Sequence, residues 1–293
     1  MKIRKRNGQE ESYLRGKIER VIGLAFESVG QTPGASVIGE LAQRVERKLL
    51  VGEGAIPVEH VQDTVEEALM VGGHYEAARS FILYRNERRR LRAMRATLMS
   101  YFGNEPELDV VLKELQQEFP GEEYSLSLLT NRFHSFYRSG IAKAAALEVL
   151  TGAAAELTSR DAPQWEMIAA RFRLLRFYDD VRNYAESVGV NSLYDKIQHF
   201  AREGLYAPAV AEAYSRAEVD AFERNLKPER DKLLNYSGLE ILIGRYLIRT
   251  RTGDVPETPQ EMFMGIAMHL AMKEDVDRSG WVLRFYDMLS TLK

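Results

Sequence analysis

The segment IRKRNGQEESYLRGKI, residues 3–18, holds a cluster of cations, a turn and the start of a helix in close succession. Its Asn7-Gly8 pair predicts a two-residue type I′ turn, because both central residues of that turn need a positive φ, which Asn and Gly tolerate best. The cations at residues 4–6 then lie on one strand of a β-hairpin, and residues 9–13 form the returning strand. Lys17 follows at a helix start, where unpaired backbone N–H groups and the helix dipole favour an anion. The segment therefore predicts an N-terminal hairpin suited to binding phosphate.

The composition limits the classes of protein to consider. A chain of 293 residues with 45% hydrophobic residues is typical of a globular protein with one large or two to three small domains. The net charge of −3 gives no overall attraction to nucleic acid or to a membrane surface, so any anion site must be local. The sequence also has no apolar run long enough to cross a bilayer or to act as a secretory signal. We expect a cytoplasmic protein with neither a nucleic-acid nor a membrane partner.

Residues that carry catalytic or metal chemistry are scarce. The sequence has no cysteine, which excludes disulfides, thiolate metal sites and thiol nucleophiles. Its 5 histidines are scattered and do not pair at metal-ligand spacing, whereas a metal site needs three or four converging ligands. The Gly-rich phosphate loop, the Gly-x-Ser-x-Gly elbow and the His-Glu-x-x-His motif are missing as well. The sequence therefore predicts no catalytic residues and no metal site.

Four segments with a helical hydrophobic period follow the hairpin, at residues 17–29, 36–50, 57–71 and from 75 onward. Pro57 opens the third segment, at a helix position where proline is tolerated, and Gly72-Gly73 ends it. The fourth segment ends in an arginine-rich run at residues 85–95. That run fits either a solvated helical extension or a docking or phosphate-binding face. Residues 100–109 predict a linker.

A second helical segment partly repeats the first. WEMIAARFRLLRF, residues 165–177, resembles YEAARSFILYR, residues 75–85, in a match that places Arg171 opposite Arg79. No basic hairpin precedes the second copy, so that copy lacks the phosphate-binding parts. We expect a degenerate helical unit that serves as a contact surface, the alternatives being a spacer or a relic.

Short helices are expected from residue 191 onward, interrupted by a small hairpin. Thr252-Gly253-Asp254 predicts a turn that pairs residues 246–251 with residues 255–258. Thr258 is the predicted N-cap of the next helix, with Glu261 completing a capping box. This helix is rich in methionine and apolar on most sides, which is typical of adaptable core packing.

These segments together resemble the N-terminal part of the large (alpha) subunit of class I ribonucleotide reductases. KRNGQEESYLRGKI resembles the start of the family's ATP-cone, and VQDTVEEALMVGGHYEAARSFILYR resembles its closing helices. YSGLEILIGRYLIRTRTGDVPETPQEMFMGIAMHLA resembles the helical domain that precedes the catalytic barrel. The resemblance implies a mainly α fold. Its parts are an ATP-cone with a hairpin and four helices at 1–98, a degenerate cone-like unit at 105–188, and an incomplete helical domain with a small hairpin at 190–293.

The resemblance implies a regulatory part of ribonucleoside-diphosphate reductase. In that family the cone binds ATP, which activates, or dATP, which inhibits, and we expect Mg²⁺ with the nucleotide and no covalently bound cofactor. Binding of dATP changes how the large subunit assembles with itself or with the radical-generating small subunit, so a homo-oligomer is expected. The cysteines of the family's catalytic barrel are missing from this chain. We therefore expect the chain to end before the barrel, as a truncated piece or the product of a split gene, with the barrel on the same or a separate polypeptide.

The resemblance also implies which residues bind the nucleotide. The implied positions are Lys5, Arg6, Glu11, Ser12, Tyr13, Leu14, Lys17, Ile18, Val58, Gln62, Arg85 and Arg88. The basic pair and Lys17 would contact triphosphate oxygens through charge-assisted hydrogen bonds. Glu11 would either accept hydrogen bonds from the base or sugar, or pair with a cation across the hairpin. Tyr13 and Ile18 would wall the base, whereas Val58 lacks the hydroxyl that the family often has nearby.

Two other functions fit the sequence. The first is a stand-alone adenine-nucleotide sensor, such as a cone-bearing transcription regulator. Against it, the cysteine zinc ribbon of such regulators is missing, and residues 230–293 resemble a reductase. The second is a helical interaction module without a ligand, which the arginine-rich run would allow.

Overall fold

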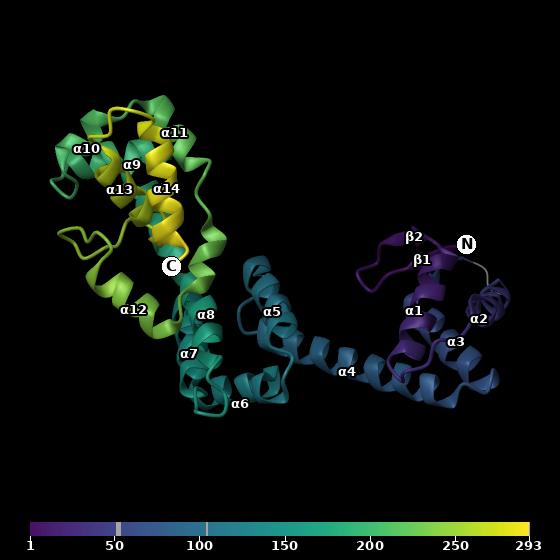
Figure 1. The fold of residues 1–293 in the computed structure, drawn as a ribbon. Coiled ribbons are helices and arrows are strands. Elements are labelled where there is room, and N and C mark those ends of the chain that lie inside the picture. The colour runs from purple at the N-terminus through teal and green to yellow at the C-terminus, as the bar shows by residue number, and fades with distance from the viewer. Residues whose placement is uncertain (51–53, 104, 293) are drawn as a thin grey trace. The chain divides into compact units, whose positions relative to one another are not determined.

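The computed structural model describes residues 1–50, 54–103 and 105–292. Residues 51–53 of the predicted cone, Asn104 of the predicted linker and Lys293 lie outside the described residues. The chain divides into two compact units, Met1–Ala93 and Met94–Lys293. The fold is mainly α with a small N-terminal sheet, which confirms the predicted fold class (Figure 1). No helix within the described ranges is both long enough and apolar enough to span a membrane.

The first unit opens with the predicted hairpin, but its turn differs from the prediction. Strands β1 (Lys2–Arg4) and β2 (Glu10–Ser12) are antiparallel, and the amide of Lys5 donates to the carbonyl of Gln9 across 2.8 Å. The type I′ prediction is wrong, because Gly8 has a φ of +83° whereas Asn7 has no positive φ. The loop spans residues 6–8, and the amide of Gly8 donates to the carbonyl of Lys5. In such a three-residue loop only the last residue needs the left-handed conformation, which suits glycine.

A further strand, β3 (Ile56–Pro57), pairs in parallel with β1 and gives the strand order β2-β1-β3. Ile3 of β1 pairs with Ile56 of β3, and both side chains are buried. A strand this short has no hydrophobic period to read, so the sequence did not predict it. It brings the start of the third helix beside the hairpin.

The helices of the first unit form where the hydrophobic period predicts them. They are α1 (Arg15–Glu27), α2 (Ala35–Leu49), α3 (Val58–Val71) and α4 (Tyr75–Met99). Ile22, Phe26, Val45 and Leu69 lie in the core of this unit. Gly72 caps α3 as predicted, and Gly73 follows with a φ of +78°.

The second unit begins within the last turns of α4, where Leu98 is buried in its core. The predicted linker at residues 100–109 is shorter in the structure, because α5 already starts at Pro106, which fits the first helical position. The elements of this unit are α5 (Pro106–Glu118), η1 (Glu122–Tyr124), α6 (Leu126–Phe136), α7 (Lys143–Glu156), α8 (Trp165–Val188), α9 (Leu193–Arg202), α10 (Pro208–Ala213), α11 (Arg216–Glu223), η2 (Pro228–Leu233), α12 (Tyr236–Arg245), α13 (Pro259–Ala271) and α14 (Arg278–Ser290).

Helix α8 contributes to both hydrophobic clusters of the second unit. Trp165 and Phe172 pack with α5, α6 and α7, whereas Phe177 and Val181 pack with α13 and α14. The two predicted domains at 105–188 and 190–293 therefore share this helix as a packing element. The matched arginines of the predicted repeat differ in burial: Arg171 of the second copy is buried, whereas Arg79 of the first copy is exposed.

Residues 246–258 form a loop, so the predicted small hairpin is wrong. The amide of Ile248, on the first predicted strand, donates to the carboxylate of Glu257 and not to a partner strand. The Arg249 guanidinium donates to the carbonyl of Ile243, in α12, and to that of Gly253, in the predicted turn. The capping box after this loop is confirmed, because Thr258 and Glu261 each accept a hydrogen bond from the other's backbone amide.

Candidate functional site

A small cavity lies between the hairpin, α1 and α3 of the first unit, with a volume of about 170 Å³. The predicted site residues that line it are Glu11, Ser12, Tyr13, Leu14, Lys17, Ile18, Val58 and Gln62. Most of its remaining wall is apolar, from Val61, Val65 and Phe81 among others. We call it the hairpin cavity. Segments far apart in the sequence meet there because β3 places the start of α3 against β1.

A second cavity of about 390 Å³ is lined mainly by arginines. Arg6 lines it from the hairpin loop, Glu59 and Gln62 line it from α3, and Arg85, Arg89, Arg92 and Ala93 line it from α4. We call it the arginine cavity. Gln62 lines both cavities, so the two adjoin at this side chain.

Glu11 is an ion-pair partner of two of the predicted cations. Its carboxylate lies 2.8 Å from the Nζ of Lys5 and 3.0 Å from the Nζ of Lys17. Hydrogen bonds from Lys5 and then Lys17 hold the pKa of Glu11 below its usual range. Of the two roles considered for Glu11, the pairing with Lys5 across the hairpin is therefore present in the structure.

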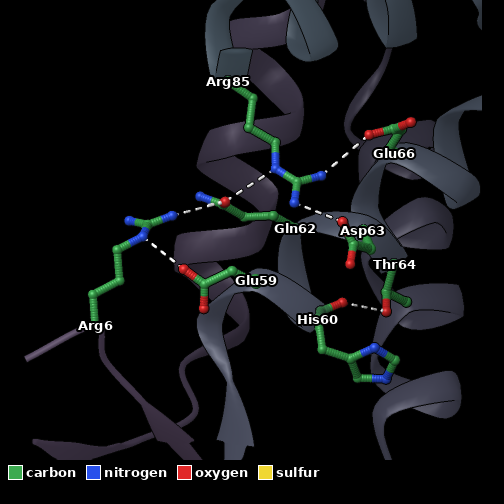
Figure 2. A network of polar contacts seen from close by, with 8 residues as sticks. All are labelled: Arg6, Glu59, His60, Gln62, Asp63, Thr64, Glu66 and Arg85. Carbon is green, nitrogen blue, oxygen red and sulfur yellow. Dashed lines mark hydrogen bonds and ion pairs between the residues drawn. The ribbon is translucent and has the colours of Figure 1, made fainter. Parts of the chain in front are cut away.

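Arg6 points toward α3 and not toward Glu11. Its Nε lies 2.7 Å from a carboxylate oxygen of Glu59, and its Nη2 donates to Oε1 of Gln62 across 3.1 Å. Figure 2 shows the guanidinium of Arg6 facing both side chains, with one contact to each. The three-residue loop carries Arg6 out of the strand, and the cation that pairs with Glu11 across the hairpin is Lys5.

Arg85 is a buried member of the same network, with only 10% of its side chain exposed. It pairs with Asp63 at 2.6 Å and with Glu66 at 3.2 Å, and its Nε donates to Oε1 of Gln62 across 3.1 Å (Figure 2). Nearby, the hydroxyl of Thr64 donates to a backbone carbonyl one turn earlier in α3. The guanidinium of Arg85 is thus held by α3 while its side chain lines the arginine cavity.

The arginine-rich run of α4 divides between several environments. Arg88, a predicted phosphate contact, is exposed and lines neither cavity. Arg89 and Arg92 line the arginine cavity instead, although the sequence analysis did not single them out. They follow Arg85 by four and seven residues, which places all three on one face of the helix. This spacing was the signal that could have identified them.

The two cavities together can accommodate a molecule with an apolar flat part and a multiply charged anionic part. Apolar walls with a few polar groups are typical of small-molecule sites, and guanidinium groups match phosphate oxygens in geometry and charge. Within residues 1–50, 54–103 and 105–292, no cluster of His, Asp and Glu side chains could hold a metal ion. A larger polar cavity of about 700 Å³ lies in the second unit between α8, α12 and the loop that follows, and none of the predicted site residues lines it.

Comparison with known proteins matches both ends of the chain to described families. Residues 1–90 match the ATP cone domain, and residues 232–293 match the ribonucleotide reductase all-alpha domain. The ribonucleoside-diphosphate reductase subunit alpha of Treponema pallidum (strain Nichols) is 43% identical over 300 residues, which cover 100% of this chain and 35% of that protein. The subunit alpha of Enterobacteria phage T4 is 32% identical over 62% of this chain and 24% of its own length. Subunit alpha of reductase 1 of Escherichia coli (strain K12) is 30% identical over 58% of this chain and 22% of its own length. The chain thus spans about a third or less of the length of these relatives.

Proposed function

Because the chain belongs to the ribonucleotide reductase family, as the N-terminal region of an alpha subunit that includes an ATP cone, we propose that its first unit binds ATP and dATP as allosteric effectors. One observation carries this proposal. An apolar cavity lined by Lys17 adjoins an arginine-lined cavity, and Gln62 lines both. Lys5 lies beside the first cavity through its ion pair with Glu11. A nucleoside triphosphate has the matching division into a flat base and a chain of phosphates.

The proposed orientation follows from the lining of the two cavities. The adenine lies in the hairpin cavity against Tyr13, Ile18 and Phe81, and the phosphates extend toward the arginine cavity. Lys5 and Lys17 are proposed to contact the phosphates near the rim. Further along, Arg6, Arg89 and Arg92 are proposed to receive the terminal phosphates, in the place expected for Arg85 and Arg88.

Several of these cations must exchange partners when a nucleotide binds. Lys5 and Lys17 share the Glu11 carboxylate, and Arg6 pairs with Glu59. These side chains are partly exposed, and exposed ion pairs are weak, so phosphate oxygens can replace the carboxylates at small cost. Mg²⁺ is proposed to arrive with the triphosphate, since this ion is usually bound through substrate phosphates, waters and one or two carboxylates. Glu59 is the carboxylate that lines the arginine cavity.

We propose that nucleotide binding regulates the reduction of ribonucleoside diphosphates by the longer alpha subunit, with ATP activating and dATP inhibiting. The partners proposed for this regulation are the catalytic barrel, on the same or a separate polypeptide, and the radical-generating small subunit. A second copy of the alpha subunit is proposed to join on dATP binding. Residues 105–188 are proposed as a degenerate cone-like contact surface and residues 190–293 as the reductase domain. The match of residues 232–293 to a reductase domain favours this function over a stand-alone nucleotide sensor.

Calorimetric titration of the whole chain with ATP, dATP and GTP tests the proposal. We expect ATP and dATP to bind more tightly than GTP. Lys17→Ala and Arg89→Ala should each weaken ATP binding about tenfold, because each removes a charge-assisted hydrogen bond. Lys2→Ala and Arg88→Ala are the matched controls and should leave the affinity unchanged, since neither residue lines the hairpin cavity or the arginine cavity.

Two results would contradict the proposal. If the folded chain binds no nucleotide, the result favours the alternative function, a helical interaction module without a ligand. If the control variants weaken binding as much as Lys17→Ala and Arg89→Ala do, the affinity reflects general positive charge and not the two cavities.

A further inference from the structure

The amide group of Gln62 is held by two arginines from opposite parts of the first unit. Its Oε1 accepts a hydrogen bond from Nη2 of Arg6, in the hairpin loop, and one from Nε of Arg85, in α4, each across 3.1 Å. Figure 2 shows both bonds meeting at the same oxygen. Gln62, in α3, is thus hydrogen-bonded both to the hairpin loop and to α4.

Two cationic donors on one atom decide which way the amide faces. A glutamine side chain has one acceptor oxygen and one donor NH₂ group, and hydrogen bonding decides which end is which. If the amide were rotated by half a turn, its NH₂ protons would meet the guanidinium protons of Arg6 and Arg85. The oxygen therefore faces the arginines, and Nε2 is the group left to donate. Across residues 1–50, 54–103 and 105–292, the structure gives this nitrogen no protein acceptor.

Arg85 contributes through Gln62 and not by reaching a ligand. Its side chain is 10% exposed, and two carboxylates, Asp63 and Glu66, hold its terminal nitrogens. Only Nε is directed at Gln62. A guanidinium fixed in this way has a defined orientation, so its hydrogen bond also fixes the orientation of the Gln62 amide.

We propose that Gln62 donates a hydrogen bond from Nε2 to the α-phosphate of the bound nucleotide, and that Arg85 is the positioning residue that orients this amide. The inference rests on the proposed function of the first unit. Gln62 lines both the cavity proposed for the base and the cavity proposed for the terminal phosphates. The α-phosphate is the charged group of a nucleotide nearest its nucleoside, so it lies where the two cavities adjoin.

The test measures the affinity of the whole chain for ATP, ADP, AMP and adenosine by displacement of a fluorescent ATP analogue. The variants are Gln62→Met, Arg85→Lys and the double variant, and thermal unfolding checks that each is folded. Arg85→Lys keeps a cation for Asp63 and Glu66, so it preserves the ion pairing that the fold needs. Arg90→Met is the control, because this exposed arginine of α4 pairs with Glu87 and lines neither cavity.

We expect Gln62→Met to lower the affinity for ATP, ADP and AMP by the same factor of about ten, since one hydrogen bond to a charged group is lost. The affinity for adenosine should not change. Arg85→Lys should lower the affinity for the same three nucleotides by a smaller common factor. In the double variant, Arg85→Lys should cause no loss of affinity beyond that caused by Gln62→Met.

Three results would overturn the inference. A loss of adenosine binding in Gln62→Met would place the contact on the base or sugar. A loss that grows from AMP to ATP would mean that the variants act on the terminal phosphates, through Arg6 or Arg85 directly. Additive losses in the double variant would show that Arg85 acts independently of Gln62. Failure of the unmodified chain to bind any nucleotide is a separate result, which contradicts the proposed function itself.

Discussion

The hydroxyl of Tyr178, in α8, donates a hydrogen bond to the Asp231 carboxylate, in η2, across 2.5 Å. Asp231 is 1% exposed and also accepts a hydrogen bond from the side chain of Gln260, in α13, across 2.7 Å. The Gln260 amide oxygen in turn accepts a hydrogen bond from the hydroxyl of Tyr286, in α14. A buried polar network thus joins four elements of the second unit. Burial raises the pKa of Asp231 to about 6, although the hydrogen bonds from Tyr178 and Gln260 oppose the shift.

Replacing Tyr178 by phenylalanine removes one donor to this carboxylate. Above pH 6 Asp231 is ionised, and a buried charge that loses a hydrogen bond destabilises the fold by about 1–3 kcal/mol. At pH 5 the carboxyl is largely protonated, so we expect a smaller loss. Urea unfolding followed by tryptophan fluorescence measures the effect, because Trp165 and Trp281 both belong to the second unit. Tyr184→Phe is the control, since its hydroxyl bonds to His199 outside this network. An equal loss at both pH values would mean that the charge of Asp231 is not involved.

Glu257 gives the second unit a further dependence on pH. The residue is 2% exposed, and burial raises the pKa of its carboxyl to about 7, although a hydrogen bond from the Ile248 amide opposes the shift. The folded state therefore binds more protons than the unfolded state between about pH 4.5 and pH 7. Its contribution to the free energy of unfolding falls as the pH rises through that interval.

We expect Glu257→Gln to raise the free energy of unfolding of the second unit by about 1–3 kcal/mol at pH 8. At pH 4 the substitution should change that free energy little. Glutamine keeps an oxygen that accepts from Ile248 but carries no charge. Urea unfolding at the two pH values, again by tryptophan fluorescence, measures the difference. The exposed Glu203→Gln is the matched control and should have no effect at either pH. Destabilisation by Glu257→Gln at pH 8 would show that the ionised carboxylate stabilises the fold.

Glu11→Gln tests the role of the carboxylate that holds Lys5 and Lys17. Its removal frees both cations, so we expect ATP to bind several-fold more tightly at low ionic strength, with the difference shrinking as salt screens the charges. Calorimetry at two salt concentrations measures this. Glu10→Gln, which removes the neighbouring partner of Lys2, is the control. Weaker ATP binding in Glu11→Gln would support the alternative role, in which Glu11 accepts hydrogen bonds from the base or sugar.

Local signals in the sequence predicted the helices and their ends. The hydrophobic period gave the helices of the first unit, Gly72 gave the end of α3, and Thr258 with Glu261 gave the capping box of α13. These signals depend on residues within a few positions of one another, whose backbone geometry does not require the rest of the fold. The hairpin predicted at residues 246–258 did not form, and the amide of Ile248, on its first predicted strand, donates instead to the buried carboxylate of Glu257.

The sequence by itself determined the mainly α fold and the N-terminal hairpin, because hydrophobic period, turn and capping chemistry are local. The residues expected at the site came from the resemblance to the ATP-cone, and eight of them line the hairpin cavity. Only the tertiary structure decided which charges pair. It directed Lys5 and Lys17 to Glu11, held Arg85 with Asp63 and Glu66, and put Arg89, but not Arg88, in the lining of the arginine cavity. The burial of Asp231 and Glu257 was decided in the same way. Side chains that are distant in the sequence meet only after the helices pack, and the free energy of a charge depends on the partners and the solvent exposure that this packing leaves it.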